Sequence, residues 1–408
     1  MSDQSALSHS LIDAIRYADR GRRVDLLALK YQAMRESSFR FYRATPYLFY
    51  QAWMGSHQWN GHPLSWVCGD LHLENMGSYR AANGLIYFDI NDFDEAQLAP
   101  CTVDLARLVT SLFVAAKDWA MPLKLARSLA EHLITVYRER LISGKPRSIE
   151  RETADGVLKR FLNQVAARSH RDLLARYTQG RGRHRHLRRE ANRLLELTEL
   201  ERATLWPWLN HTLATNGGFH LRDIVFRIAG TSSLGLARYA VLVKSKKGKY
   251  RLLDLKAVMP PAGTAYWAEW QPAWPDTASR VVTLQHRLQD VSPTYLQALV
   301  GPSGESFVLR SLQPQADRIN LQVNQLQKGN RLRDLLETVA QLLASAHLRS
   351  GGQQDSAITD ELIAFAKQPG WDTELLEQAE QYAKQVRNDY RLFCGLTVSD
   401  LLSPVVSS

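Results

Sequence analysis

The spacing of apolar residues predicts that the first half of the chain is mainly helical. Apolar side chains recur at helical spacing between Leu11 and Leu29. From Thr102 to about Leu141 the same period returns with few polar interruptions, which is typical of a buried helix. Helical spacing continues from Glu152 to Leu213 and is interrupted near Gly180–Gly182.

A change of period near Phe219 predicts a sheet. Residues 222–258 alternate apolar and polar positions, with many β-branched residues, in three runs separated by a glycine turn and a basic turn. A helix over Ser279–Val291 and a strand over Ser306–Leu312 are expected next. Beyond Asn330 the helical period returns.

These changes divide the 408 residues into three parts of one α+β protein. Residues 1–218 are expected to form a mainly helical lobe and residues 219–328 a β-rich lobe. Residues 329–408 are expected to form helices that complete the first lobe.

The first cluster of candidate functional residues lies between two predicted strands. Gly69–Asn75 reads GDLHLEN; it follows a short strand at Ser65–Cys68 and precedes a hairpin with an Asn-Gly turn. Asp70 could orient the proton of a hydroxyl group, and Asn75 could reach a metal ion. The structural alternative is that Asp70 and His72 cap a turn and Asn75 takes a positive φ.

A second, acidic cluster closes the hairpin. Asp89, Asp92, Asp94 and Glu95 lie within seven residues at the end of an apolar strand. Carboxylates this close repel one another unless a divalent cation or basic neighbours compensate. A calcium loop of the EF-hand type does not fit, because Phe93 stands where a ligand is needed and no Gly follows.

In combination, these motifs resemble the aminoglycoside phosphotransferase and choline kinase branch of the kinase-like superfamily. That branch carries a G-D-L-H-x-x-N loop, an I-D-[WF]-[ED] metal segment and a D-L-A helix start. The resemblance implies that Asp70 is the catalytic aspartate and that Asn75 and Asp92 bind Mg²⁺. It also implies that Asp104, in Asp-Leu-Ala, supports the loop. The spacing from Asn75 fits Asp89 better, so Asp89 stays a competing metal ligand.

A glycine segment follows the first strand of the β-rich lobe; it comprises Gly230, Thr231, Ser232, Ser233, Leu234 and Gly235. It is not a P-loop, because Leu236 and Ala237 replace the required Lys and Ser/Thr. It is not a Rossmann turn either, because a strand follows it instead of a helix. Glycines between antiparallel strands are how kinase-like lobes lay backbone over ATP phosphates, and an ordinary hairpin loop is the alternative.

Lys256 ends the third strand of this lobe, where the resemblance implies a lysine that binds phosphates. The alternative is a solvated lysine at a strand end. The expected partner, a Glu on the next helix, is missing, since that helix offers Gln285 and Asp290. Glu269 lies earlier, in a Trp-rich stretch, so no salt-bridge partner is assigned to Lys256.

The order of the motifs predicts a two-lobed, circularly permuted kinase-like fold. The nucleotide-lobe signature at 222–312 follows the loop at 69–104, whereas kinase-like chains have the reverse order. The helix LLETVAQLLASAHLRSG resembles one that precedes the catalytic loop in these phosphotransferases, so His347 and Arg349 could line the cleft or serve in the core or surface. The motif set also resembles a bacterial family of uncharacterised proteins with G-D-x-H-x-x-N, N-D-F-D-E and S-L-G-x-x-R-Y sequences.

The charge balance favours anionic partners. The net charge is +10 and the pI is about 9.5. Much of the excess lies in Arg181–Arg193, which could bind nucleic acid or an acidic substrate. Because this run lacks interleaved aromatic residues and its spacing suits a solvated helix face, nucleic acid is not the favoured partner.

The sequence also indicates in which cellular compartment the protein is found. No apolar run is long enough to span a bilayer, and the N-terminal residues show no secretory signal pattern. The three cysteines have no paired spacing, which predicts reduced thiols and a cytoplasmic location.

The sequence therefore predicts a phosphotransferase that uses ATP and Mg²⁺ and acts on an unknown hydroxylated acceptor, a small molecule rather than a protein. Nucleotidyl transfer to a protein, on similar residues with ATP reversed, is an enzymatic alternative. A nucleotide-binding pseudoenzyme that acts as a regulator is a second alternative, supported by the missing Glu. A basic nucleic-acid-associated protein is a third.

Overall fold

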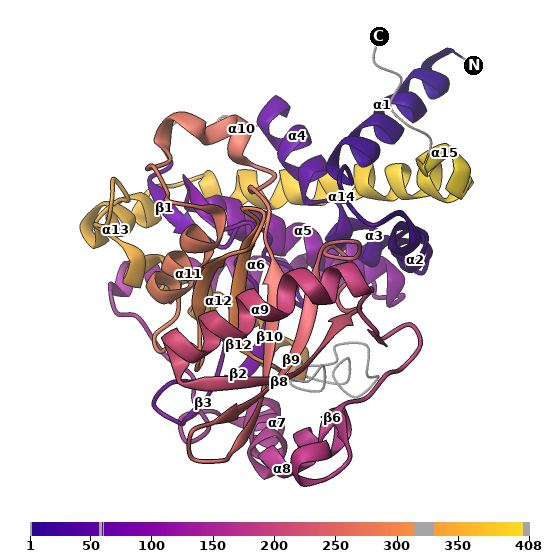
Figure 1. The fold of residues 1–408 in the computed structure, drawn as a ribbon. Coiled ribbons are helices and arrows are strands. Elements are labelled where there is room, and N and C mark those ends of the chain that lie inside the picture. Colours follow the sequence, from indigo (N-terminus) through magenta and orange to yellow (C-terminus); the bar gives the residue numbers. More distant parts are fainter. Residues whose placement is uncertain (1, 57–58, 60, 314–329, 403–408) are drawn as a thin grey trace.

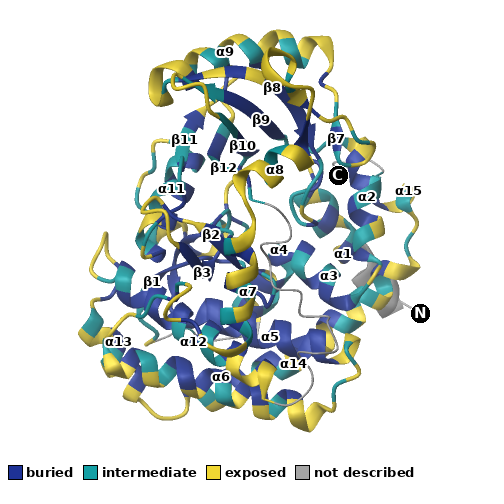
Figure 2. Cartoon of the chain, turned by 90° about the horizontal axis from the view of Figure 1, so that it is seen from below, coloured by how far each residue is buried: buried dark blue, intermediate teal, exposed yellow. Residues whose placement is uncertain are grey.

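The computed structural model of the chain is a mixed α+β structure that describes residues 2–56, 59, 61–313 and 330–402. Helices gather on one side of the molecule and a six-stranded antiparallel sheet lies on the other (Figure 1, Figure 2). The predicted α+β class with an antiparallel sheet is confirmed. Among the described helices, none has the length and apolar character needed to cross a membrane.

The helical side is built from both ends of the chain. Its N-terminal helices are α1 (Ser2–Ala18), α2 (Val24–Met34), α3 (Ser38–Ala44) and α4 (Pro46–Ser56). The longer helices α5 (Thr102–Asp118) and α6 (Leu123–Ser143) pack with α12 (Arg331–Ser350), α13 (Thr359–Lys367) and α14 (Trp371–Gly395). The last helix, α15 (Val398–Leu402), contacts α1 and α2. Helix α5 is buried continuously from Thr102 to Ala116, because nearly all of its positions are small or apolar. It forms the centre of the main hydrophobic core.

Two short antiparallel strand pairs position the two polar clusters. Strand β1 (Leu64–Val67) pairs with β4 (Gln97–Pro100), and β2 (Met76–Arg80) pairs with β3 (Ile86–Ile90). The first loop runs from β1 to β2, and the acidic segment runs from β3 back to β4. Because the two loops join the same two pairs of strands, they must lie side by side. The hairpin predicted between β2 and β3 is confirmed.

The large sheet has the strand order β11-β12-β10-β9-β8-β7. Its strands are β7 (Leu194–Leu195), β8 (Phe219–Arg227), β9 (Arg238–Ser245), β10 (Tyr250–Ala257), β11 (Gln297–Val300) and β12 (Ser306–Ser311). The strands predicted within 222–258 and at 306–312 are confirmed. Alternate residues of each strand face the two sides of the sheet, and each side has its own apolar cluster.

Helices cover the sheet and connect it to the rest. Helix α9 (Glu199–Gly217) lies along one face (Figure 2), where Leu205, Leu209 and Leu213 join the apolar cluster of that face. Helix α11 (Thr277–Leu288), close to the predicted 279–291, contacts β11, β12 and α12. Between β10 and α11 lie the short α10 (Thr264–Trp267) and the 3-10 turn η2 (Ala268–Trp270).

The predicted interruption of the helices near Gly180–Gly182 is confirmed, but it extends from residue 178 to residue 198, where the sequence predicted helix on either side of the glycines. Helices α7 (Gly156–Ala167) and α8 (His170–Tyr177) are followed by β5 (Thr178–Gln179), the 3-10 turn η1 (Gly182–His184) and β6 (His186–Leu187). Gly180 has a φ of +76°, and a Cβ atom there would lie 2.3 Å from the carbonyl oxygen of His184. The tight turn at Gly180 is incompatible with a continuous helix. The basic run is therefore not a solvated helix face.

Candidate functional site

A cleft between the helical side and the sheet is lined by six separate chain segments, two of which contribute only Arg22 and Arg43. Asp70 and Asn75 come from the first loop and Asp92 from the acidic segment. The glycine turn and Lys256, at the end of β10, come from the sheet. The fold thus brings most of the predicted site residues to one place.

The start of the first loop is fixed by Asp104 in the first turn of α5. This buried carboxylate accepts hydrogen bonds from the backbone N–H groups of Cys68, at 2.7 Å, and Gly69, at 2.9 Å. Gly69 has a φ of +79°, and a Cβ atom there would lie 2.0 Å from the carbonyl oxygen of Glu95. The predicted supporting role of Asp104 is confirmed, and glycine is required at position 69 because the acidic segment passes so close.

Asp70 is oriented by Arg107, which the motifs did not identify. Nε of Arg107 donates to Oδ1 of Asp70 at 2.6 Å, and the arginine is fully buried. The guanidinium lies 4.4 Å from the ring centre of Tyr42 and 5.2 Å from that of Phe49. The Asp70 side chain keeps 16% of its surface exposed. The Asp70 carboxylate is therefore held in place by Arg107, while part of it remains open to the cleft.

The environment makes Asp70 more basic than a surface aspartate. Burial raises the pKa of Asp70 to about 6, although the nearby Arg107 opposes this change. A general base is most effective when its pKa is close to the working pH. Asp70 is thus suited to accept or orient a proton near neutral pH.

The side chain of Asn75 connects the two polar loops. Nδ2 donates to the backbone oxygens of Asp70, at 3.1 Å, and Asp92, at 3.3 Å. Asn75 is 5% exposed and lines the cleft. No donor among the described residues binds its Oδ1, so this oxygen can serve as a ligand for a cation.

Lys256 forms ion pairs with the acidic segment. Its Nζ lies 3.2 Å from Oδ1 of Asp92 and 2.5 Å from Oδ2 of Asp94. Burial raises the pKa of Asp94, and Lys256 opposes this change. The lysine and Asp92 are 164 positions apart in the chain, and their contact supplies the partner that the sequence left unassigned.

Helix α11 contributes an arginine to this region where a Glu was expected. The guanidinium of Arg280 donates to the backbone oxygen of Asp94, at 2.7 Å, and to that of Ala96. Gln285, on the same helix, donates instead to Gln289 at 3.1 Å. The helix therefore holds the backbone of the acidic segment and leaves the carboxylates of Asp92 and Asp94 to Lys256.

The glycine segment forms the turn between β8 and β9, and Arg22 fastens it. Gly230 and Gly235 have φ values of +86° and +90°, which favours glycine at both ends of the turn. Nη1 of Arg22 donates to the backbone oxygens of Ser232, at 2.6 Å, and Leu234, at 2.9 Å. The first four residues of the segment line the cleft, whereas the last two do not.

Asp89, the competing metal ligand, does not line the cleft. It lies on β3, is 2% exposed, and its Oδ2 is 3.4 Å from Nη2 of Arg349. Burial raises the pKa of Asp89 to about 6, against the influence of Arg349.

His347 is fully buried, with Nδ1 at 3.0 Å from the hydroxyl of Tyr137. Of the roles considered for His347, the core role is the one observed.

Arg107, Asp94 and Arg22 hold or line the site, and the sequence assigned them no role there. Arg107 had a signal, since an arginine within an apolar helix is rarely buried without a partner. Asp94 belonged to the acidic cluster, but the motif assigned only Asp92. Arg22 lies in a basic run far from the other motifs, and nothing local marked it.

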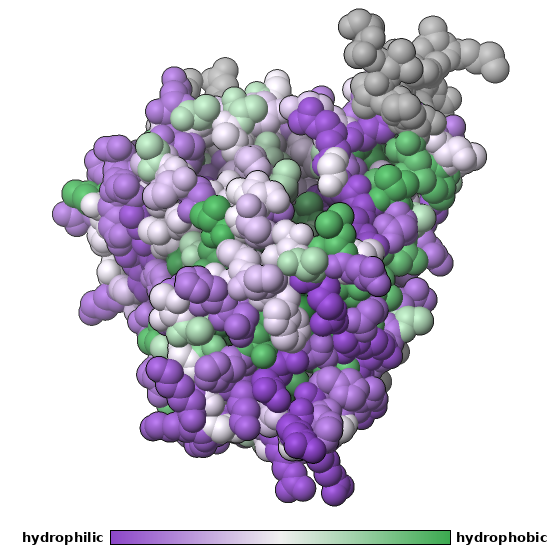
Figure 3. Space-filling model, in the orientation of Figure 1, coloured by the Kyte–Doolittle hydropathy of each residue, from purple (hydrophilic) through white to green (hydrophobic). Residues whose placement is uncertain are grey.

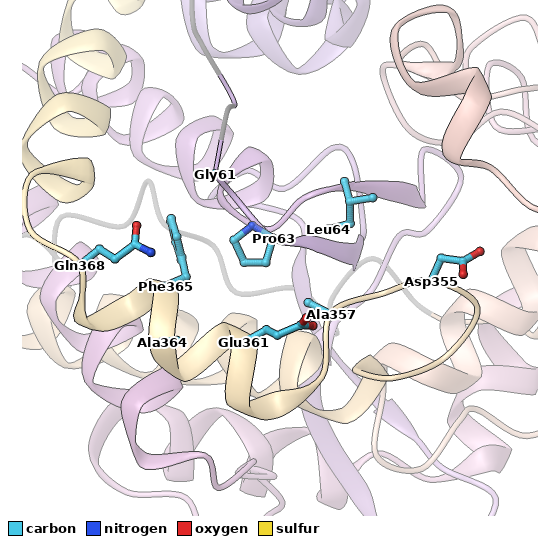
Figure 4. Close-up of a pocket in the computed structure, with 9 residues that line it drawn as sticks. All are labelled: Gly61, Pro63, Leu64, Asp355, Ala357, Glu361, Ala364, Phe365 and Gln368. Atoms are coloured by element: carbon cyan, nitrogen blue, oxygen red, sulfur yellow. The ribbon is translucent and has the colours of Figure 1, made fainter.

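A second cavity, of about 390 Å³, lies against helix α13 (Figure 4). Phe365, Pro63 and Leu64 form its apolar part, and Asp355 and Glu361 are its two carboxylates. None of the predicted site residues lines this cavity, and the described residues of its lining include no basic side chain. It therefore offers nothing that would hold a phosphate group.

Fold and cleft together define a mixed α+β protein in which an antiparallel sheet faces a pair of acidic loops. The chain belongs to the family described as "Uncharacterized protein conserved in bacteria (DUF2252)", whose model matches residues 22–396. No curated protein matches the chain. No solved structure matches it either.

Proposed function

We propose that the protein is an ATP- and Mg²⁺-dependent phosphotransferase with a circularly permuted, kinase-like fold. The observation that carries this proposal is the contact of Lys256 with Asp92 and Asp94, beside Asp70 and Asn75. A phosphate-binding lysine, metal-binding carboxylates, an amide ligand and a proton-accepting aspartate are the parts that phosphoryl transfer requires.

The order of elements in the sheet supports the kinase-like part of the proposal. A glycine turn joins β8 to β9, the lysine stands on the next strand, β10, and helix α11 follows before β11 and β12. Kinase-like lobes arrange a glycine loop, a lysine strand and a helix in this sequence. Residues 219–328 would then be the nucleotide lobe, with residues 1–218 and 329–408 forming the other lobe.

Asp70 would act on the acceptor. Its carboxylate would take the proton of the acceptor hydroxyl as the new bond forms between that oxygen and the γ-phosphorus of ATP. The bond from the γ-phosphorus to the bridging oxygen breaks, and ADP leaves with that electron pair. Arg107 would hold the carboxylate in position throughout.

The residues present fit a magnesium ion. Among the described residues, no group of three or more His, Cys, Asp or Glu side chains forms a metal cluster. Magnesium, however, is commonly held by one or two carboxylates together with water and phosphate oxygens. Asp92, with 40% of its side chain exposed, and Oδ1 of Asn75 would supply such ligands. The ion would neutralise charge on the phosphates.

The basic groups of the sheet would bind the phosphates. Lys256 would exchange part of its pairing with Asp92 and Asp94 for a phosphate oxygen when the nucleotide and metal enter. The backbone of residues 230–233 would cover the phosphates, in a turn whose position Arg22 fixes.

The missing Glu on α11 leaves the pseudoenzyme as a second candidate. Lys256 depends for its position on the same carboxylates that would bind the metal, and no described residue of α11 supports it. A regulator that binds a nucleotide without turnover would tolerate this arrangement.

Labelled ATP tests the proposal. The full-length protein is incubated with Mg²⁺, a cell extract and ATP labelled on either the γ- or the α-phosphate. We expect label to enter an acceptor from γ-labelled ATP only, and only when Mg²⁺ is present. Transfer from α-labelled ATP would indicate nucleotidyl transfer. Mg²⁺-dependent ATP binding without any transfer would support the pseudoenzyme.

A further inference from the structure

We propose that the end of the sheet remote from the cleft binds nucleic acid through its phosphate backbone. The surface consists of two segments, residues 168–193 and residues 244–251, and we call it the basic tip. This proposal is independent of the phosphotransferase activity.

The positive charge of the protein is concentrated in the basic tip. Residues 168–193 contain nine arginines and two acidic residues, and residues 244–251 contain four lysines, one arginine and no acidic residue. The two segments together carry a net charge of +12, compared with +10 for the whole chain. The remaining residues therefore carry a net charge of −2. An excess so confined produces a local positive field instead of a generally basic protein.

The fold brings the two segments together around Tyr250. The hydroxyl of Tyr250 donates to the backbone oxygen of Gly182 at 2.5 Å, and its own backbone oxygen lies 2.8 Å from Nε2 of His170. The Arg185 guanidinium is 5.3 Å, and the Lys244 ammonium 5.6 Å, from the centre of the Tyr250 ring. An aromatic residue thus lies among the cations, supplied by a strand distant in the sequence.

Most of these cations are available for a ligand. Within the described part of the chain, carboxylates pair with Arg189, through Asp223 and Glu196, and with Arg193, through Glu190. Among the described residues, no ion pair with a carboxylate is found for eleven further cations near Tyr250. These are Arg171, Arg176, Arg181, Arg183, Arg185, Arg188, Lys244, Lys246, Lys247, Lys249 and Arg251.

The chemistry of the tip fits a phosphate backbone better than a membrane. Ten of its fourteen cations are arginines, whose planar guanidinium groups bind phosphate oxygens in a bidentate manner. The exposed large hydrophobic side chains of the described structure all lie outside both segments, so nothing at the tip would enter a bilayer. Hydrophilic residues also cover the lower end of Figure 3, where α7, α8 and β6 lie in Figure 1.

Except for Arg193, whose backbone oxygen accepts a hydrogen bond from Ile228 beside the glycine turn, the tip is separate from the cleft. Strand β9 runs from Arg238, which lines the cleft, to Ser245 in the basic turn. At about 3.3 Å per residue, the two ends of the strand are about 23 Å apart. Changes at the tip should therefore leave ATP turnover unchanged, which distinguishes a failure of this proposal from a failure of the proposed function.

Fluorescence anisotropy with the full-length protein tests the proposal. The probes are a labelled DNA duplex of mixed sequence and one of its single strands, titrated at several salt concentrations between about 50 and 200 mM. We expect binding to both probes, with log K falling linearly against log salt. The variant K246E/K247E should bind at least about tenfold more weakly, and its salt slope for the duplex should be smaller by about two.

The matched control is K117E/K124E, which reverses two exposed lysines on the helical side and changes the net charge equally. It should bind the duplex within about twofold of the unaltered protein. The proposal would be overturned if neither probe bound at the lowest salt, or if the control variant lost as much duplex affinity as K246E/K247E. Binding to phosphatidylserine vesicles without binding to the oligonucleotides would also overturn it. Thermal unfolding of each variant checks that the fold is intact.

Discussion

At the scale of single residues, the environment of Asp70 brings the pKa of its carboxyl group closer to neutral pH. Two opposing influences act on the same carboxylate, since burial raises its pKa to about 6 and the buried Arg107 opposes that change. The position of the carboxylate is fixed by Arg107, and the backbone on either side of the loop is fixed by Asp104 and Asn75. These contacts give the Asp70 carboxylate a restricted geometry and a raised pKa.

The pH dependence of ATP turnover should report this environment. Because Asp70 must be ionised to accept a proton, we expect kcat/KM to rise as the pH increases through about 6. The variant Arg107→Gln removes the positive charge that favours the ionised form, so its acidic limb should move to higher pH. Its maximal rate should fall by about tenfold or more, because the carboxylate is no longer held. If the acidic limb of the Arg107→Gln profile stayed at the same pH as in the unaltered protein, Asp70 would not be the titrating group.

At the scale of secondary-structure elements, much of the site follows from how strands pair. The sequence predicted β8, β9, β10 and β12 well, because alternation and β-branched residues are local signals. It predicted the break near Gly180 but not its extent, since short strands and turns replace the expected helix over residues 178–198. It also left Lys256 without a partner, because its contact with the acidic segment depends on two elements meeting in space. Local patterns could not supply that contact.

The close approach of the two loops makes Gly69 critical. In Gly69→Ala a Cβ atom would lie 2.0 Å from the carbonyl oxygen of Glu95, and φ is +79°. We expect the free energy of unfolding to fall by at least about 3 kcal/mol, or the variant not to accumulate. Gly84→Ala is the matched control, since φ is +86° there but no atom lies within 4 Å of the added Cβ. It should lose only about 1–2 kcal/mol in urea unfolding. Equal losses would show that the approach of the acidic segment is unimportant.

The turn between β8 and β9 depends on Arg22. Removing its hydrogen bonds to Ser232 and Leu234 should let the glycine turn move away from the phosphates. For Arg22→Ala we expect the KM for ATP to rise by about tenfold, equivalent to about 1.4 kcal/mol, with a smaller change in kcat. Arg20→Ala is a nearby control, because Arg20 packs on the ring of Tyr17 and does not line the cleft. A KM unchanged in Arg22→Ala would exclude this positioning role.

At the scale of the whole molecule, two ends of the chain build one helical side and a central segment builds the sheet. The sequence predicted a helical lobe from both ends of the chain and a β-rich lobe between them, because motif order and periodicity are visible without a structure. Helix α14 contacts α5, and Arg16 of α1 donates to the backbone oxygen of Asp400 in α15 at 2.6 Å. The sequence indicated less well which charged residues would be buried. Arg107 and Asp89 are hidden by packing between distant segments.

Buried carboxylates should make the stability of the molecule depend on pH. Burial raises the pKa of Asp70 and Asp89 to about 6 and that of Glu95 to about 7, so the folded state holds protons that the unfolded chain releases. The stabilisation that these three carboxyl groups give to the folded state is fully present below about pH 4 and is lost as the pH rises through about 7. The lowered pKa values of His170 and His286 act in the opposite direction.

The variant Glu95→Gln isolates one of these carboxyls. Its free energy of unfolding, measured in urea at pH 5 and at pH 7.5, should fall less over this interval than that of the unaltered protein, by at least about 1 kcal/mol. The amide oxygen can still accept the hydrogen bond from the backbone N–H of Ala262. An identical pH dependence in both proteins would contradict the raised pKa of Glu95.

The most direct test of the central claim compares ATP turnover and ATP binding in the unaltered protein and in Asp70→Asn. The substitution keeps the size of the side chain but removes the group that would accept the proton of the acceptor. With Mg²⁺ and the acceptor fraction of a cell extract, we expect turnover to fall by about 10²–10⁴-fold while Mg²⁺-dependent binding of ATP remains. Turnover that is unchanged in Asp70→Asn would contradict the assignment of the catalytic aspartate and, with it, the proposed phosphotransferase mechanism.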